Sequence, residues 1–192
     1  MGNSSHAKRL RNLVDQIPDD TVIRGVLQHH ADMEDQNGDH LVAMLGASYL
    51  DHALGVALQV SMRSLTESER KGLFDFEKNG PLAEFSAKIK LAHALNIIGP
   101  MTLADLNHMR KIRNAFAHSS WPINFSTQEI IDICGLLKAP DRLTILGQWA
   151  WSGSSKARYV NTAISLAKDL KSGIKTQLIF HKGRAISVRV LP

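Results

Sequence analysis

The sequence predicts an all-α protein, a helical bundle of about seven or eight helices that ends in a small C-terminal β-hairpin. Apolar residues recur at helical spacing in four central segments, residues 39–65, 82–98, 102–118 and 130–137. Turn signals separate these segments, namely Asn37-Gly38, Asn79-Gly80-Pro81 and Gly99-Pro100. Residues 177–181 and 184–190 are mostly apolar or β-branched and flank Lys182-Gly183, which is typical of two strands joined by a tight turn.

The composition is that of one domain spanning residues 1–192. We expect the helical core at about residues 39–138, and a C-terminal helix with a basic tail in residues 156–192. Hydrophobic residues make up 44% of the chain and charged residues 21%, with no uninterrupted apolar run of about 18 residues. Residues 1–20 lack the apolar centre of a signal peptide. These features predict a cytoplasmic protein that does not enter a membrane.

The net charge of +5 is concentrated near the C-terminus. Residues 156–192 contain eight Lys or Arg and one acidic residue, a net charge of +7. Residues 1–155 contain fifteen Lys or Arg and seventeen Asp or Glu, a net charge of −2. Such a tail can attract nucleic acid or an acidic protein surface. Proteins that bind single-stranded nucleic acid alternate basic and aromatic residues, and this segment does not. We therefore expect its charges to lie on a solvated helix face and on a charged edge strand.

The longest predicted helix, residues 39–65, combines leucines with small residues. Gly46 and Gly55 lie within it, and each costs about 0.5–1 kcal/mol relative to Ala, so we expect them to allow a neighbouring helix to approach closely. Asp51 lies in the middle of this apolar helix and requires a partner. The next helix should begin at the capping pair Thr66 and Glu69.

The helix of residues 102–118 organises the rest of the chain. Thr102 and Asp105 form a predicted N-cap pair, and Pro122 requires the helix to end near His118. One apolar stripe runs along it, formed by Leu106, Met109, Ile112 and Phe116. Arg113 falls inside this stripe, and an unpaired buried guanidinium costs several kcal/mol.

Two more helices complete the predicted bundle. Phe125 and Ile130 form a hydrophobic staple at a capping box, which begins a helix that ends near Leu137. Residues 157–171 form an amphipathic helix with its apolar residues inward, namely Val160, Ala163, Ile164, Ala167 and Leu170.

Arg110, Asn114 and His118 are spaced by four residues and form a polar row beside the stripe. In the structural interpretation, Arg113 pairs with Asp51 and His118 bonds the last carbonyls of the helix. Asp51 and Arg110 are then the predicted interaction residues. In the catalytic interpretation, the site residues are Arg113, Asn114 and His118. Arg113 steadies a phosphoryl oxygen and His118 takes the proton from an RNA 2′-hydroxyl, which gives cleavage without a metal.

Other chemistry lacks a sequence signature. The chain contains no Gly-rich phosphate loop, dinucleotide fingerprint, nucleophile elbow or HExxH motif. Its histidines and the single Cys134 lack metal-ligand spacing, so we predict no metal and no cofactor. Cys134 lies in an Ile-rich helix and is predicted to be a buried thiol.

Two family resemblances follow from these segments. IRNAFAH, together with ASYLDHAL, resembles the HEPN type of α-helical domain, whose ribonuclease members carry an Arg, a polar residue and a His at this spacing. ASYLDHALGVAL and NGPLAEFSAKIKLAHALNIIG resemble the mannitol operon repressor family. The second resemblance implies an all-α, self-associating protein of transcriptional repression that has no recognisable DNA-binding helix.

We therefore predict a regulator of the mannitol operon repressor type that acts through protein contacts. Its expected partners are a second copy of the chain, as a homodimer or larger homo-oligomer, and a regulatory protein. Specific DNA binding by the isolated chain is not expected, because the sequence lacks a helix-turn-helix pair. The alternative is a HEPN-type metal-independent ribonuclease, toxin-like in its use, for which RNA is the substrate.

Overall fold

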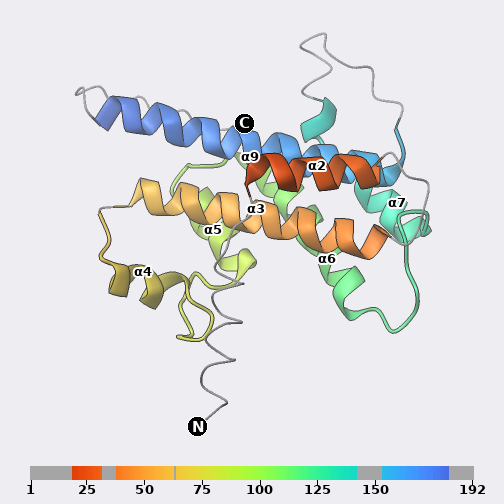
Figure 1. Ribbon diagram of the computed structural model, residues 1–192, viewed down its shortest axis with the longest axis horizontal. Coiled ribbons are helices and arrows are strands. Elements are labelled where there is room, and N and C mark those ends of the chain that lie inside the picture. Colours follow the sequence, from red (N-terminus) through yellow and green to blue (C-terminus); the bar gives the residue numbers. More distant parts are fainter. Residues whose placement is uncertain (1–18, 32–37, 63, 142–152, 182–192) are drawn as a thin grey trace.

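The computed structural model describes residues 19–31, 38–62, 64–141 and 153–181, and these residues contain helices and loops but no strand (Figure 1). The labelled helices are α2 (Asp20–Ala31), α3 (Asp39–Ser61), α4 (Glu67–Phe74), α5 (Phe85–Ala94), α6 (Pro100–His118), α7 (Gln128–Gly135) and α9 (Ser155–His181). The predicted all-α class is thus confirmed for this part of the chain.

The predicted C-terminal hairpin is not supported. Its first strand, residues 177–181, lies within α9, and residues 184–190 lie outside the described part of the chain. Local β-propensity was misleading here, because extending an existing helix adds one hydrogen bond per residue and needs no new nucleus. That gain offsets the cost of about 1 kcal/mol for Gly173 within the helix.

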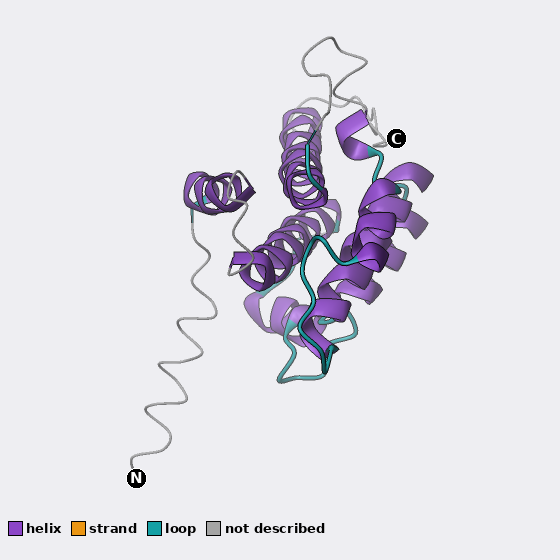
Figure 2. Ribbon diagram, turned by 90° about the vertical axis from the view of Figure 1, so that its right-hand side faces the viewer, coloured by secondary structure: helices purple, strands orange, loops and turns teal. Residues whose placement is uncertain are grey.

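Helix α3 lies at the centre of the bundle. It packs against α2, α5, α6 and most extensively α9, and the view of Figure 2 shows helices on several sides of the centre of the fold. Gly46 makes the α9 contact possible, since a Cβ built there would lie 2.8 Å from Tyr159 Cε1. The predicted reason for a glycine within this helix is therefore confirmed at Gly46. The hydroxyl of Tyr159 donates to the Ala43 carbonyl at 2.6 Å, which fixes the two helices in register.

The buried residues form one core cluster to which these helices contribute. The α6 stripe is buried as predicted, with Leu106, Met109 and Ile112 fully enclosed and Phe116 nearly so. The predicted inward face of α9 is likewise buried or packed against the core, and Tyr159 and Leu166 extend it. Periodicity in the sequence was sufficient to find these faces because each helix buries one contiguous stripe.

Helix α3 is also long and apolar enough to span a membrane, by length and composition. Its most apolar window has a mean hydropathy of 1.5, and 61% of that window is buried inside the fold. It is the only such helix in the described ranges. Burial against α9, α5 and α6 is the reason that a core helix reaches this hydropathy.

The helix ends are held in different ways. At α4 the Thr66 side chain accepts from the Glu69 amide and the Glu69 side chain accepts from the Thr66 amide, which confirms the predicted capping box. At α6 the predicted N-cap was wrong: Gly99 is the N-cap and Pro100 the first helical residue, where the missing N–H of proline is harmless. The C-terminal end at His118 is as predicted.

Candidate functional site

The candidate site is the polar edge of α6, with the charged groups that face it from α3 and α5. The C-terminal half of α6 places Arg110, Arg113 and Asn114 at the half-buried boundary of the helix, whereas His118 is exposed at its end. Sequence spacing therefore identified the polar row correctly. It did not identify the contacts that these side chains make.

Arg113 does not pair with Asp51. Its Nη1 donates to Asn114 Oδ1 at 3.0 Å, while Asp51 Oδ1 accepts from Lys88 Nζ at 2.7 Å. Burial raises the pKa of Asp51, and Arg113 lies near enough for its charge to act against that rise. The expected ion pair is therefore corrected from Arg113 to Lys88, a residue of α5 rather than α6.

The Asp51 and Lys88 pair is partly enclosed between α3 and α5. The Lys88 side chain is 10% exposed and that of Asp51 is 31% exposed. A Cβ built on Gly55 would lie 3.8 Å from Lys88 Cε, so Lys88 passes beside Gly55 on its way to the carboxylate. Burial raises the pKa of the Asp51 carboxyl, and the attraction of Lys88 only partly offsets this. Removing these two charges from water therefore costs free energy of folding that their mutual attraction only partly returns.

The sequence contained a signal for Lys88 that was overlooked. Phe85, Ile89 and Ala92 define the buried face of α5, and Lys88 lies three residues after Phe85 and one before Ile89. On a helix this spacing places Lys88 on the same face. A lysine at such a position must find a carboxylate on a facing helix.

Along the outer edge of α6, donor groups predominate. Arg110 Nε is buried and has no hydrogen-bond partner. Among the described residues no carboxylate lies within ion-pair distance of Arg110 or Arg113. Because Asn114 Oδ1 is occupied by Arg113, the amide NH2 of Asn114 is the group left to make other bonds. Arg113 and His118 are five residues apart, about 140° around the helix axis, so in one chain their side chains diverge.

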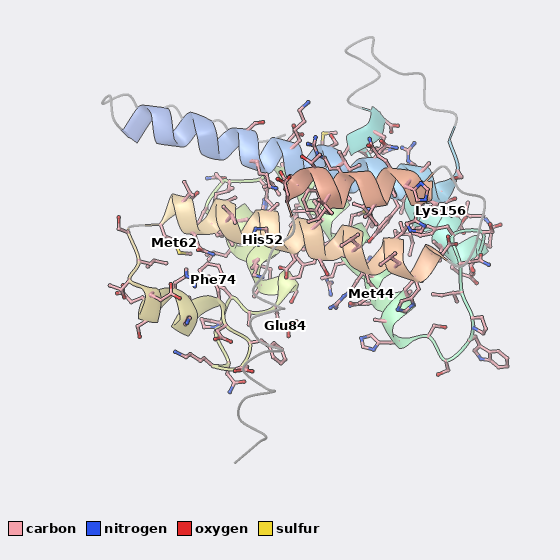
Figure 3. The ribbon with its side chains drawn as sticks, viewed as in Figure 1. Met44, His52, Met62, Phe74, Glu84 and Lys156 are labelled. Carbon is pink, nitrogen blue, oxygen red and sulfur yellow. The ribbon has the colours of Figure 1, made fainter. Side chains whose placement is uncertain are left out.

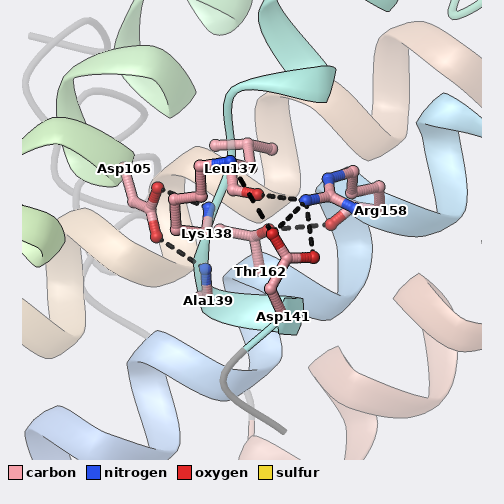
Figure 4. A network of polar contacts seen from close by, with 7 residues as sticks. All are labelled: Asp105, Leu137, Lys138, Ala139, Asp141, Arg158 and Thr162. Atoms are coloured by element: carbon pink, nitrogen blue, oxygen red, sulfur yellow. Dashed lines mark hydrogen bonds and ion pairs between the residues drawn. The ribbon is translucent and has the colours of Figure 1, made fainter. Parts of the chain in front are cut away.

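Asp105 was predicted as part of the N-cap pair of α6. It instead holds the start of the helical turn that follows α7. Its carboxylate is fully buried and accepts from the amides of Lys138 and Ala139 at 2.8 Å each (Figure 4). In the same network Arg158 of α9 bonds both oxygens of Asp141, at 2.8 and 2.9 Å. These contacts fasten the segment after α7 to α6 and α9.

A second buried pair holds the first turn of α3 to the first turn of α9. Asp39 Oδ1 lies 3.0 Å from Lys156 Nζ, and Asp39 Oδ2 accepts from the Phe125 amide at 2.8 Å. Figure 3 shows Lys156 at this end of the two helices. Both side chains are less exposed than one part in ten. Lys156 therefore belongs to the core rather than to a solvated tail.

Two further cations of residues 156–181 are paired: Arg158 with Asp141, and Lys171 with Asp20 of α2. Lys171 also lies over the Tyr49 ring, 4.8 Å from its centroid. Burial, followed by the charge of Asp20, raises the pKa of Tyr49 to about 12. Three of the eight Lys or Arg residues in 156–192 therefore form ion pairs within the described part of the fold.

Burial also shifts the pKa of several titratable side chains outside this edge. Burial lowers the pKa of His52 and of His108, which favours neutral rings. Burial raises the pKa of the Cys134 thiol to about 12, and Cys134 is buried as predicted. Within the described ranges no three His, Cys, Asp or Glu side chains come together in a way that could hold a metal ion.

Over the described residues, these features define an all-helical fold in which the polar edge of α6 offers hydrogen-bond donors. Residues 73–180 match the sequence profile of the mannitol repressor family, and the chain belongs to that family. The matched range includes α5, α6, α7 and nearly all of α9. No match was found among curated proteins.

A solved structure supports the fold. The chain is similar to a possible transcriptional regulator, YggD, from Shigella flexneri, with 16% sequence identity and a TM-score of 0.50. The similarity covers 80% of this chain and 98% of that one. At this identity the likeness concerns the fold alone.

Proposed function

We propose that the chain is a transcriptional regulator of the mannitol repressor type that acts through protein contacts. The observation that carries this proposal is the family match over residues 73–180, which includes the polar edge of α6. The name of the similar structure, a possible transcriptional regulator, supports the same class. We place the protein in the cytoplasm, as a homo-oligomer that binds a second regulatory protein.

The first test is genetic. Transcripts are compared between a strain that lacks the gene and the same strain with the gene restored, during growth with and without mannitol. A regulator is expected to change a small set of transcripts that restoration returns to their original level. An unchanged transcript profile under both conditions would contradict the proposal.

The second test concerns direct DNA binding. Purified protein is titrated against DNA from the regions upstream of the affected genes, at several salt concentrations. We expect only weak binding that falls steeply with salt, because any phosphate contacts would come from scattered surface cations. A sequence-specific footprint at physiological salt would show instead that the chain itself reads DNA.

The ribonuclease alternative rests on the Arg113 to Asn114 hydrogen bond and on an exposed His118 one turn further along α6. Since Arg113 and His118 diverge within one chain, a cleavage site would have to combine groups from two copies. Mixed RNA is incubated with the protein in EDTA, beside Arg113→Ala and His118→Ala variants. Cleavage by the parent that both variants lose would establish this alternative over a purely regulatory role.

A further inference from the structure

Among the described residues, the outer edge of α6 and the loop after it carry an arginine without an ion-pair partner and an exposed tryptophan. We define the α6 edge as Arg110, Asn114, His118 and Trp121. Arg110 lacks a carboxylate partner and its buried Nε lacks any partner. Trp121 is 81% exposed, the highest exposure among the large apolar side chains of the described residues.

Hydrogen bonds hold two parts of this edge, the side chain of Asn114 and the backbone of Trp121. Arg113 occupies the Asn114 carbonyl oxygen at 3.0 Å, which directs the amide NH2 away from Arg113. Ser119 Oγ donates to the Trp121 carbonyl at 2.7 Å and accepts from the Trp121 amide at 3.2 Å. Because these bonds fix the backbone of Trp121, binding at this edge costs less ordering entropy than binding at a loose loop.

The chemistry of the edge indicates an acidic protein partner. Arg110 and the amide NH2 of Asn114 present hydrogen-bond donors, and residues 106–118 contain the cations Arg110, Lys111 and Arg113 but no acidic residue. Arg and Trp are also the residue types that most often dominate the binding energy of protein interfaces. Successive positions of the row lie about 6 Å apart along α6, the same spacing as carboxylates placed every fourth residue on a partner helix.

Nucleic acid fits these observations less well. Binding of a single strand requires several aromatic rings on which successive bases stack. Over the described part of α6 and its loop, Trp121 is the one large exposed aromatic side chain.

We propose that the α6 edge is the docking surface for an acidic helix of a partner protein. This inference rests on the proposed function, since it names the chemistry of the partner through which the regulator acts. Arg110 binds a carboxylate through its guanidinium, Asn114 donates to a second one, and Trp121 packs beside the apolar part of the bound helix.

The test uses the full chain and a defined probe. The probe is a fluorescent, alanine-based helical peptide with Glu at every fourth position, and its control is the same peptide with Gln in place of Glu. Anisotropy is measured at low and at physiological salt for the parent and for Arg110→Gln and Trp121→Ala. Lys168→Gln is the matched control, because it removes one exposed positive charge from α9, away from this edge.

We expect the Glu peptide to bind more tightly than the Gln peptide, and each edge variant to weaken binding about tenfold, the effect of losing about 1.4 kcal/mol. Lys168→Gln should bind as the parent does. Circular dichroism of each variant establishes that it is folded. Equal binding of both peptides, or equal loss in Lys168→Gln, would overturn the inference.

A parallel arm measures single-stranded RNA of mixed sequence. Tighter binding of RNA than of the Glu peptide, lost in Arg110→Gln and Trp121→Ala, would assign the edge to nucleic acid and refute an acidic helix as the partner. Failure of the peptide assay leaves the genetic test of the proposed function unaffected, so the two can fail separately.

Discussion

Replacing Lys88 by Met tests how the core accommodates the Asp51 carboxylate. The change keeps most of the apolar stem of Lys88 but removes the cation 2.7 Å from Asp51 Oδ1. Breaking a fully buried pair costs about 3–5 kcal/mol, because the remaining charge is left unpaired. Asp51 is 31% exposed, so water relieves part of that cost, and we expect a loss of about 2–3 kcal/mol.

The double variant Lys88→Met with Asp51→Leu separates the unpaired charge from the lost packing. An apolar pair of similar volume avoids the desolvation of both ions, so its stability should return to within about 1 kcal/mol of the parent. Arg113→Met is the matched control, since it also removes a cation near Asp51 but breaks no ion pair. We expect Arg113→Met to cost less than about 1 kcal/mol.

Urea unfolding followed by circular dichroism measures all four proteins. Since about 1 kcal/mol shifts the melting temperature of a domain of this size by about 2–4 °C, thermal melts give an independent estimate. The reasoning would be refuted if Arg113→Met lost as much stability as Lys88→Met. That result would mean that the carboxylate depends on Arg113, as the sequence alone suggested.

Three further predictions follow from particular contacts. Gly46→Ala should destabilise the protein by about 1–2 kcal/mol, because the added Cβ would meet the Tyr159 ring. Gly25→Ala has open space around it and should stabilise the protein by about 0.5–1 kcal/mol. Equal effects of the two changes in urea unfolding would contradict the close approach of α9 to Gly46. Asp105→Ala should cost about 2–4 kcal/mol because two backbone amides lose their acceptor, and a loss below about 0.5 kcal/mol would show that water replaces the carboxylate. The Cys134 thiol, whose pKa is raised from 9.0 to about 12, contributes stability that is fully present below about pH 9 and is lost as the pH rises toward 12. Cys134→Ala should reduce the loss of stability between about pH 9 and about pH 12. In the parent protein, the thiol should react with a disulfide reagent at about pH 8 only as fast as the protein unfolds. Immediate reaction of the folded protein would contradict the burial of Cys134.

The sequence by itself determined the helices and their buried faces. The stripes of α5, α6 and α9 could be found because a helix repeats every 3.6 residues and each buries one side. The capping box of Thr66 and Glu69, the end of α6 near His118 and the burial of Cys134 were likewise predictable, since each depends on residues close in the chain or on one helix face. The polar row with Arg110 was visible for the same reason.

Only the tertiary structure decided which charges meet. Two cations, Lys88 and Arg113, lie near Asp51. Asp51 pairs with Lys88 because α3 packs against α5 at this point, and the spacing of residues within a single helix does not determine that choice. The pairing of Asp39 with Lys156 joins residues far apart in the chain and converts an expected surface charge into a core contact. Side-chain contacts between helices depend on their relative register and rotation, and a sequence pattern contains only the rotation of each helix about its own axis.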